Sequence, residues 1–159
     1  MNTLEALKSV LKEEIEGCRN LLELLQEEKR RLMGLELDGV ESVIKAKDIL
    51  ILKLRLLEEE RVRVVERWQA ENGMDRSNPE KDLQQVTLKR LAEKGGDGEL
   101  MDLRSKLVSL TQSIKEMNEF NRGMIDRTLD FIHKSHPIFS KINPGSPDLE
   151  KGRVYSRAT

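Results

Sequence analysis

The feature that most constrains the fold is a long run of apolar side chains near the C-terminal end of the chain. Its members follow one another at steps of three and four residues, which keeps them on one stripe of a helix. A second stripe then appears, displaced around the same helix. The first stripe holds Leu100, Leu103, Leu107, Leu110, Ile114, Met117, Asn121, Met124, Thr128 and Phe131, and the second holds Ile125, Leu129, Ile132 and Phe139. A helix packed on one neighbour needs one stripe, so the second predicts a surface for a partner.

Composition favours long amphipathic helices over a sheet. Charged residues make up 36% of the 159 residues and aromatic residues only 3%, a profile that suits helices with solvated faces better than a wide enzyme core. The formal net charge is −1, so no strong field would attract nucleic acid or an anionic membrane. The length suggests one domain with a tail.

The chain carries no segment that we expect to enter a membrane. Its richest apolar stretch, Ile49 to Leu57, is interrupted by Lys53 and Arg55, whereas a spanning helix needs about 20 apolar residues. The N-terminal residues lack the basic start and apolar core of a signal peptide. The single cysteine, Cys18, is expected to be a small buried hydrophobe. We therefore expect a cytoplasmic protein without membrane insertion.

The pattern predicts an all-α fold, an elongated antiparallel helical bundle with coiled-coil character, built from three long helices plus one short helix. A single helical domain would occupy residues 1–142, followed by a flexible C-terminal tail at 143–159. Within the domain we expect a helical hairpin at 1–71, a linker with the short helix at 72–98, and a last helical segment at 99–142. The expected helices lie near residues 3–33, 40–71, 80–94 and 99–136.

Local signals place the ends of these helices. Thr3 is a plausible N-cap of the first helix. Asp38 and Glu41 have the spacing of a capping box for the second helix. Pro79 can open the short helix, and the glycines from 95 to 98 end it. Pro137 should kink or end the last helix near His136.

The residues that catalysis or metal binding would require do not converge. His133 and His136 are three residues apart, but Pro137 disrupts their turn and no cysteine accompanies them. Di-metal bundle enzymes use Glu-x-x-His pairs, and this chain has none. We therefore expect no catalytic, cofactor-binding or metal-binding residues, no cofactor and no enzymatic activity.

Together these segments resemble the FlgN family of flagellar export chaperones over roughly residues 4 to 142. The most distinctive part is the Asn-x-x-Asn pair, Asn118 and Asn121, inside a late apolar helix. The closing Val154-Tyr155-Ser156 resembles the short tyrosine-containing end of the family. The hairpin resembles the family pattern at Leu11, Glu14, Leu21, Leu22, Glu28, Leu32, Asp38, Ile44, Lys47, Leu50, Leu54, Leu57, Glu58 and Arg61.

The resemblance implies a chaperone that binds the C-terminal helical segment of hook-filament junction proteins and delivers them to the flagellar type III export apparatus. An amphipathic cargo helix needs apolar anchors one turn apart, which the second stripe supplies. Tyr155 is the candidate contact with the export gate. The candidate cargo-binding residues are Asn118, Asn121, Met124, Ile125, Leu129, Ile132 and Phe139.

A structural coiled-coil scaffold that self-associates through its helical stripes is the alternative. One buried asparagine in a coiled coil often sets register and oligomeric state, which Asn121 could do. In a chaperone the same amide could bind the cargo backbone, or it could sit at a partly wet seam. The sequence leaves these readings of Asn121 open.

Overall fold

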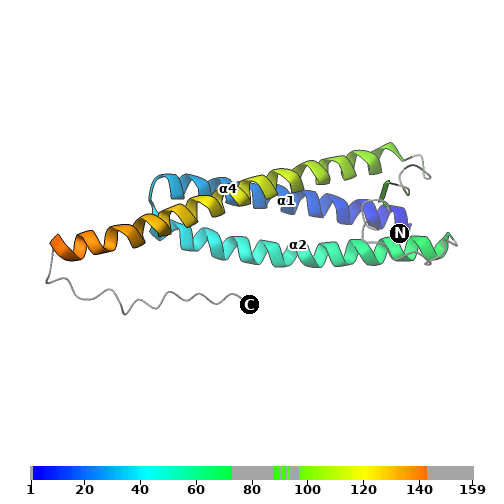
Figure 1. The fold of residues 1–159 in the computed structure, drawn as a ribbon. Coiled ribbons are helices and arrows are strands. Elements are labelled where there is room, and N and C mark those ends of the chain that lie inside the picture. The colour runs from blue at the N-terminus through cyan, green and yellow to red at the C-terminus, as the bar shows by residue number, and fades with distance from the viewer. Residues whose placement is uncertain (1, 73–87, 90, 92, 94–96, 143–159) are drawn as a thin grey trace. The chain divides into compact units, whose positions relative to one another are not determined.

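The computed structural model describes residues 2–72, 88–89, 91, 93 and 97–142. Three long helices account for most of these residues (Figure 1): α1 (Thr3–Met33), α2 (Leu37–Glu71) and α4 (Gly98–Ile142). The described part of the chain contains no strand, which confirms the all-α prediction.

Two predicted segments fall wholly or largely outside the described residues. Most of the short helix expected at 80–94 does so, although Leu88, Lys89, Leu91 and Glu93 are themselves helical. The tail expected at 143–159, with Tyr155, lies entirely outside them. The chain divides into two compact units, Met1–Arg122 and Gly123–Thr159, which are taken separately below.

In the first unit, α1 and α2 form an antiparallel hairpin (Figure 1). Three polar contacts join the two helices along their length. Thr3 Oγ1 donates to Glu71 Oε2 at 2.7 Å, Arg61 Nε donates to Glu14 Oε1 at 3.0 Å, and Lys47 Nζ donates to Glu28 Oε1 at 3.0 Å. As residue numbers rise along α1 they fall along α2, so these contacts set one antiparallel register.

Small and apolar side chains close the space between the helices. Gly17 lies where α1 packs closely against a leucine of α2, since a Cβ at this position would be 2.7 Å from Leu54 Cδ2. Near the N-terminal end of α1, fully buried leucines from α1 and from the start of α4 meet the C-terminal part of α2. This cluster consists of Leu7, Leu11, Ile15, Val64, Val65, Leu88, Leu91, Leu100 and Leu103.

Two of the predicted N-caps are wrong. Asn2, rather than Thr3, caps α1, because its side chain accepts from the backbone N–H of Leu4. Thr3 is buried and its hydroxyl is directed to Glu71 across the hairpin. The Thr3 hydroxyl, which the local pattern assigns to the cap, is therefore used in a tertiary hydrogen bond to Glu71.

The predicted capping box of α2 is also wrong. The helix begins at Leu37, and Glu36 occupies the cap position without a side-chain hydrogen bond. The connection is this short because Leu35 adopts a left-handed backbone conformation (φ 55°) and the N–H of Glu36 donates to the Arg31 carbonyl. Asp38 thus lies inside the first turn, where the helix dipole favours a carboxylate, and Glu41 pairs with Lys45 at 2.8 Å.

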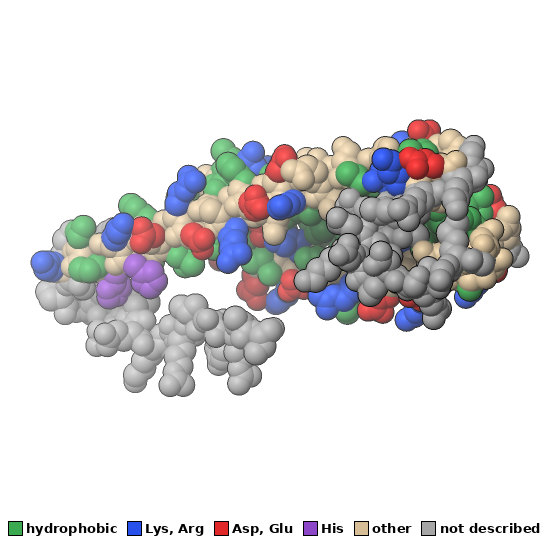
Figure 2. Space-filling view, turned by 45° about the vertical axis from the view of Figure 1, so that its right-hand side comes forward, with side chains coloured by type: hydrophobic (Ala, Val, Ile, Leu, Met, Phe, Trp, Pro, Cys, Tyr) green, Lys and Arg blue, Asp and Glu red, His purple; other side chains and the backbone are tan. Residues whose placement is uncertain are grey.

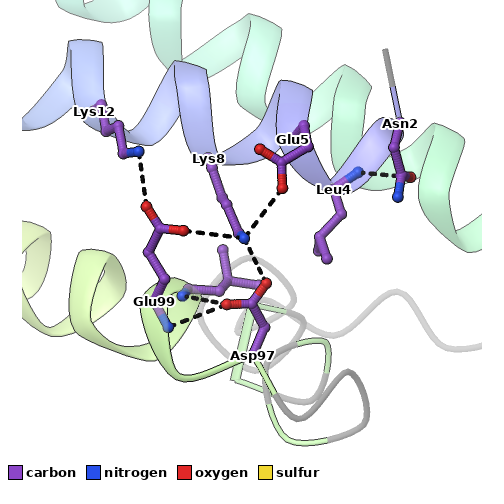
Figure 3. A network of polar contacts seen from close by, with 8 residues as sticks. Asn2, Leu4, Glu5, Lys8, Lys12, Asp97 and Glu99 are labelled. Carbon is purple, nitrogen blue, oxygen red and sulfur yellow. Dashed lines mark hydrogen bonds and ion pairs between the residues drawn. The ribbon is translucent and has the colours of Figure 1, made fainter.

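A network around Lys8 joins the N-terminal end of α1 to the start of α4 (Figure 3). Lys8 Nζ lies 2.7 Å from Asp97 Oδ2 and 3.1 Å from Glu99 Oε2, and Lys12 Nζ lies 2.7 Å from Glu99 Oε1. Asp97 also caps α4, since its Oδ1 accepts from the backbone N–H groups of Glu99 and Leu100. One carboxylate therefore starts α4 and attaches it to α1.

Pro137 does not end the last helix. The backbone remains helical from Gly98 to Ile142 with Pro137 inside it, so the predicted end near His136 is wrong. A proline cannot donate a backbone N–H, but the turns on either side retain their own hydrogen bonds, and these suffice to continue a long helix. Within the described residues, no helix combines the length and hydropathy that crossing a membrane would require.

The Lys8 network predicts a stability that depends on pH. Lys8→Met removes the ammonium and keeps an unbranched apolar side chain, so the variant should melt at a lower temperature than the wild type near pH 7. The hydrogen bond from Lys8 lowers the pKa of Asp97, and those from Lys12 and Lys8 lower the pKa of Glu99. Stability that comes from a lowered carboxyl pKa is present above the unfolded-state pKa and is lost as pH falls through the folded-state value.

The difference in melting temperature between wild type and Lys8→Met should therefore shrink as the pH falls below about 4, where carboxylates begin to protonate. Thermal melts followed by circular dichroism from pH 7 downward would measure it. Lys12→Met is the matched control, because the Lys12 side chain is 57% exposed and contacts only Glu99 in the network; its effect should be smaller. A difference for Lys8→Met that stays constant into the acid range would contradict the prediction.

Candidate partner-binding surface

A buried polar junction joins all three helices of the first unit. Asn121 Nδ2 donates to the backbone carbonyl of Leu25 at 2.8 Å and to Glu28 Oε2 at 2.8 Å. Glu28 in turn accepts from Lys47 of α2 at 3.0 Å. Only 1% of Glu28 and 1% of Asn121 is exposed. Because Lys8 meets Asp97 at one end and Leu25 meets Asn121 further along, this part of α4 runs parallel to α1.

The junction bears directly on the predicted role of Asn121. Its amide donors are used by α1, and the side chain is buried rather than placed at a wet seam. Its Oδ1 atom is buried and accepts no hydrogen bond among the described residues. An asparagine in this position specifies register at some cost in stability, and its unsatisfied Oδ1 atom is enclosed in the junction.

The second unit begins just after this junction, and its described part, Gly123–Ile142, exposes several large apolar side chains. Leu129 is 47% exposed and Ile132 is 48% exposed, with Phe131 and Ile138 more exposed still. Thr128 Oγ1 donates to the Met124 carbonyl at 2.9 Å, so this hydroxyl is used inside the helix. Figure 2 shows green apolar side chains interleaved with charged ones here, beside the two histidines in purple.

The predicted cargo residues thus fall into different environments. Asn118, Leu129 and Ile132 are exposed, Met124 and Ile125 are half-buried, and Asn121 is buried. Phe139 is helical, but its side chain lies outside what the structure describes, as does Tyr155. Phe131 corrects the prediction for the first stripe, since it is 70% exposed. The first stripe is buried at Leu100, Leu103 and Asn121, half-buried at its other members up to Thr128, and exposed at Phe131.

A groove in the first unit was not predicted. It has a volume of about 620 Å³, and α1 contributes Cys18 while α2 and α4 contribute Ile51 and Val108. Arg55 and Arg104 also line it, and Arg104 Nε is buried with no hydrogen-bond partner in the described structure. The signal in the sequence was weak: Ile51 and Val108 stand outside the predicted stripes.

Burial in this groove affects two titratable groups. Burial, and then the nearby Glu14 carboxylate, raise the pKa of the Cys18 thiol to about 11, so the thiol is protonated at neutral pH and behaves as the predicted buried hydrophobe. Burial also raises the pKa of Glu14, and the Arg61 guanidinium opposes that shift. The sequence pattern places charged residues on solvated helix faces and therefore does not reveal the buried pairs of Glu14 with Arg61 and of Glu28 with Lys47.

No group of three or more His, Cys, Asp or Glu side chains is arranged to hold a metal ion in the described part of the chain. What the geometry does present is helical surface: exposed apolar residues on α4 and a groove between helices. These features belong to proteins that bind other polypeptides.

Comparison with protein families agrees with this class. The family model described as FlgN protein matches residues 1–146, and the chain therefore belongs to the FlgN family. Membership implies the general role of that family, which is flagellar export chaperone, and the family is not one of enzymes. Comparison with curated proteins and with solved structures found no match.

The buried junction yields a stability prediction. Asn121→Ala removes the donor to Glu28 and the Leu25 carbonyl, and loss of a buried partner should cost about 1–3 kcal/mol of unfolding free energy. Asn121→Asp should cost more, because it places a second carboxylate against Glu28. Urea unfolding at neutral pH would measure both.

Asn118→Ala is the matched control, one helical turn away and exposed. A surface substitution of this kind should stay within about 0.5 kcal/mol of the wild type. If Asn121→Ala were as mild as Asn118→Ala, the junction would contribute nothing measurable to stability.

Proposed function

We propose that this chain is a cytoplasmic chaperone of flagellar type III export that binds the C-terminal helical segment of hook-filament junction proteins. In this role it keeps the cargo competent for export and delivers it to the export apparatus. Family membership supports the general role. The exposed apolar face of α4 supports the binding of a helical segment.

That apolar face is the observation that carries the proposal. Ile125, Leu129 and Ile132 follow one another at steps of four and three residues, which places them on one side of the helix. Leu129 and Ile132 are about half exposed, and Ile125 is half-buried. An amphipathic helix that lays its apolar face on such a surface would find anchors at successive turns.

Neighbouring residues suit a surface that accepts a helix. Met124 is half-buried beside Ile125, and its flexible thioether side chain can adapt to the shape of a partner. Asn118 is exposed in the first unit, and we include it because it precedes Ile125 by one heptad in the sequence. We include Phe139 by its place in the sequence pattern. We leave Asn121 out of the contact surface because α1 already binds its amide.

Ile125→Ser and Leu129→Ser should remove most of the affinity for a cargo C-terminal peptide, because each replaces an apolar anchor by a polar group. Isothermal titration calorimetry with that peptide would measure the affinity, and thermal melts on the same variants would measure stability. The wild type should bind one peptide per chain. The stability loss should be small, because Leu129 is already 47% exposed.

Leu100→Ala is the matched comparison for stability. Leu100 is fully buried in the core cluster, so its truncation should cost about 2–5 kcal/mol and leave the apolar face of the second unit unchanged. If Leu129→Ser destabilised the fold as much as Leu100→Ala, Leu129 would be a core residue. If it left peptide affinity unchanged, the cargo site would lie elsewhere, and the groove beside Ile51 and Val108 would be the next surface to substitute.

The scaffold alternative differs in stoichiometry. A scaffold that self-associates through its α4 stripes would form a stable oligomer, and adding peptide would not change the mass of that oligomer. A chaperone would gain one peptide per chain. Size-exclusion chromatography with light scattering, with and without peptide, distinguishes the two.

We propose Tyr155 as a contact with the export gate, on the basis of the family resemblance alone. Tyr155→Ala should then reduce motility and leave peptide affinity unchanged, which swimming assays and calorimetry on one variant would show. Loss of peptide affinity in this variant would instead assign the tail to the cargo site.

A further inference from the structure

Another exposed apolar stripe lies on α2, far in sequence from the surface of α4 that we propose for cargo. Ile49, Leu52 and Leu56 are spaced by three and four residues and are 72%, 57% and 59% exposed. They lie on a different side of α2 from Val43 and Val64, which are buried. We name Ile49, Leu52 and Leu56 the outer stripe.

Four of the charged residues near the outer stripe are arranged symmetrically about Leu52. Lys45 and Glu59 lie seven residues before and after it, and Glu41 and Arg63 lie eleven residues before and after it. Steps of seven and eleven residues return a helix to nearly the same side, so all four charges border the stripe. Their side chains are more than half exposed, and their ion pairs among the described residues are local: Glu41 with Lys45, and Arg63 with both Glu59 and Glu60.

This arrangement is complementary to itself in one orientation only. When two copies of α2 lie antiparallel about a two-fold axis at Leu52, Lys45 faces Glu59 of the second copy and Glu41 faces Arg63 of the second copy. Ile49 then lies near Leu56 of the second copy. A parallel pairing in register would instead bring Lys45 against Lys45 and Arg63 against Arg63, and like charges disfavour such a contact.

We propose that the outer stripe of α2 is a self-association surface that pairs two copies of this chain antiparallel. The pairing is isologous, because each copy contributes the same patch. Six apolar side chains at its centre supply the attraction, and the flanking charges set the orientation rather than the strength, since exposed ion pairs contribute little. The contact is small, so the dimer forms weakly and depends on concentration.

Site-directed crosslinking tests the orientation. Each single-cysteine variant carries Cys18→Ala, so that the introduced thiol alone reacts with a short bismaleimide. Leu52→Cys, on the axis, should crosslink to itself. Lys45→Cys and Glu59→Cys should crosslink poorly alone and well when mixed. Ser109→Cys, exposed on α4, reports random collisions.

Two crosslinking outcomes would overturn the proposal. One is a Leu52→Cys yield no greater than that of Ser109→Cys. The other is a Lys45→Cys variant that crosslinks to itself better than to Glu59→Cys, which would mean a parallel contact or another surface.

Sedimentation velocity over a concentration series tests the strength. Leu52→Asp should weaken dimerisation by at least about tenfold, because it places a charge at the centre of the apolar contact. Arg63→Glu should weaken it, and the double variant Glu41→Arg, Arg63→Glu should restore it, because the charges that face each other are exchanged. A wild type that stays monomeric at millimolar concentration, or a Leu52→Asp variant with unchanged association, would overturn the proposal.

The self-association proposal can be tested independently of the chaperone proposal. Leu52→Asp should keep the peptide affinity of the wild type, and Leu129→Ser should keep its dimerisation. If the outer stripe instead bound cargo, Leu52→Asp would lose peptide affinity, and the self-association proposal would fail.

Discussion

The contact of Asn121 with the Leu25–Glu28 turn of α1 is the interaction on which the arrangement of the first unit most depends. It is buried, and it joins α4 to α1 and, through Glu28 and Lys47, to α2. A shift of α4 by one turn would separate the Asn121 amide from the Leu25 carbonyl and the Glu28 carboxylate, and an amide buried without partners is expensive in a low-dielectric interior. Apolar packing alone is far less sensitive to such a shift.

The Lys8 network acts with this junction from the other end of the same segment. Lys8 holds Asp97, which also caps α4, so the start of the helix and its attachment to α1 share one carboxylate. Because Asn121 is hydrogen-bonded to Leu25 and Glu28 of α1 further along, α4 is aligned with α1 over the first unit. The apolar residues from Gly123 onward are therefore not needed to align α4 in the first unit, which leaves the exposed ones available to a partner.

The proposed cargo face and the proposed dimer contact use different sides of different helices. The first depends on Leu129 and Ile132 of α4, and the second on the outer stripe of α2 with its symmetric charges. Neither surface rests on the groove between the helices, where Arg104 Nε is buried without a partner.

The sequence by itself determined the helical class, the approximate helix bounds and the stripe that holds the exposed Leu129 and Ile132, because these follow from the local period of apolar residues. The end of α2 at Glu71 shows how well that period works where no competing contact intervenes. The helix caps were less predictable. Thr3 donates a hydrogen bond to Glu71 instead of capping α1. The left-handed conformation of Leu35 turns the chain so sharply that α2 begins at Leu37, before the predicted residue 40.

Only the tertiary structure decided which charged and polar residues are buried. Glu14 and Glu28 carry no local mark that separates them from exposed glutamates, and the place of Asn121 on the first stripe left its burial open. Their burial is stabilised by partners that lie 19 to 96 residues away in sequence. A pattern read along one helix contains no information about such partners, because the free energy of burying a polar group depends on the group that meets it in space.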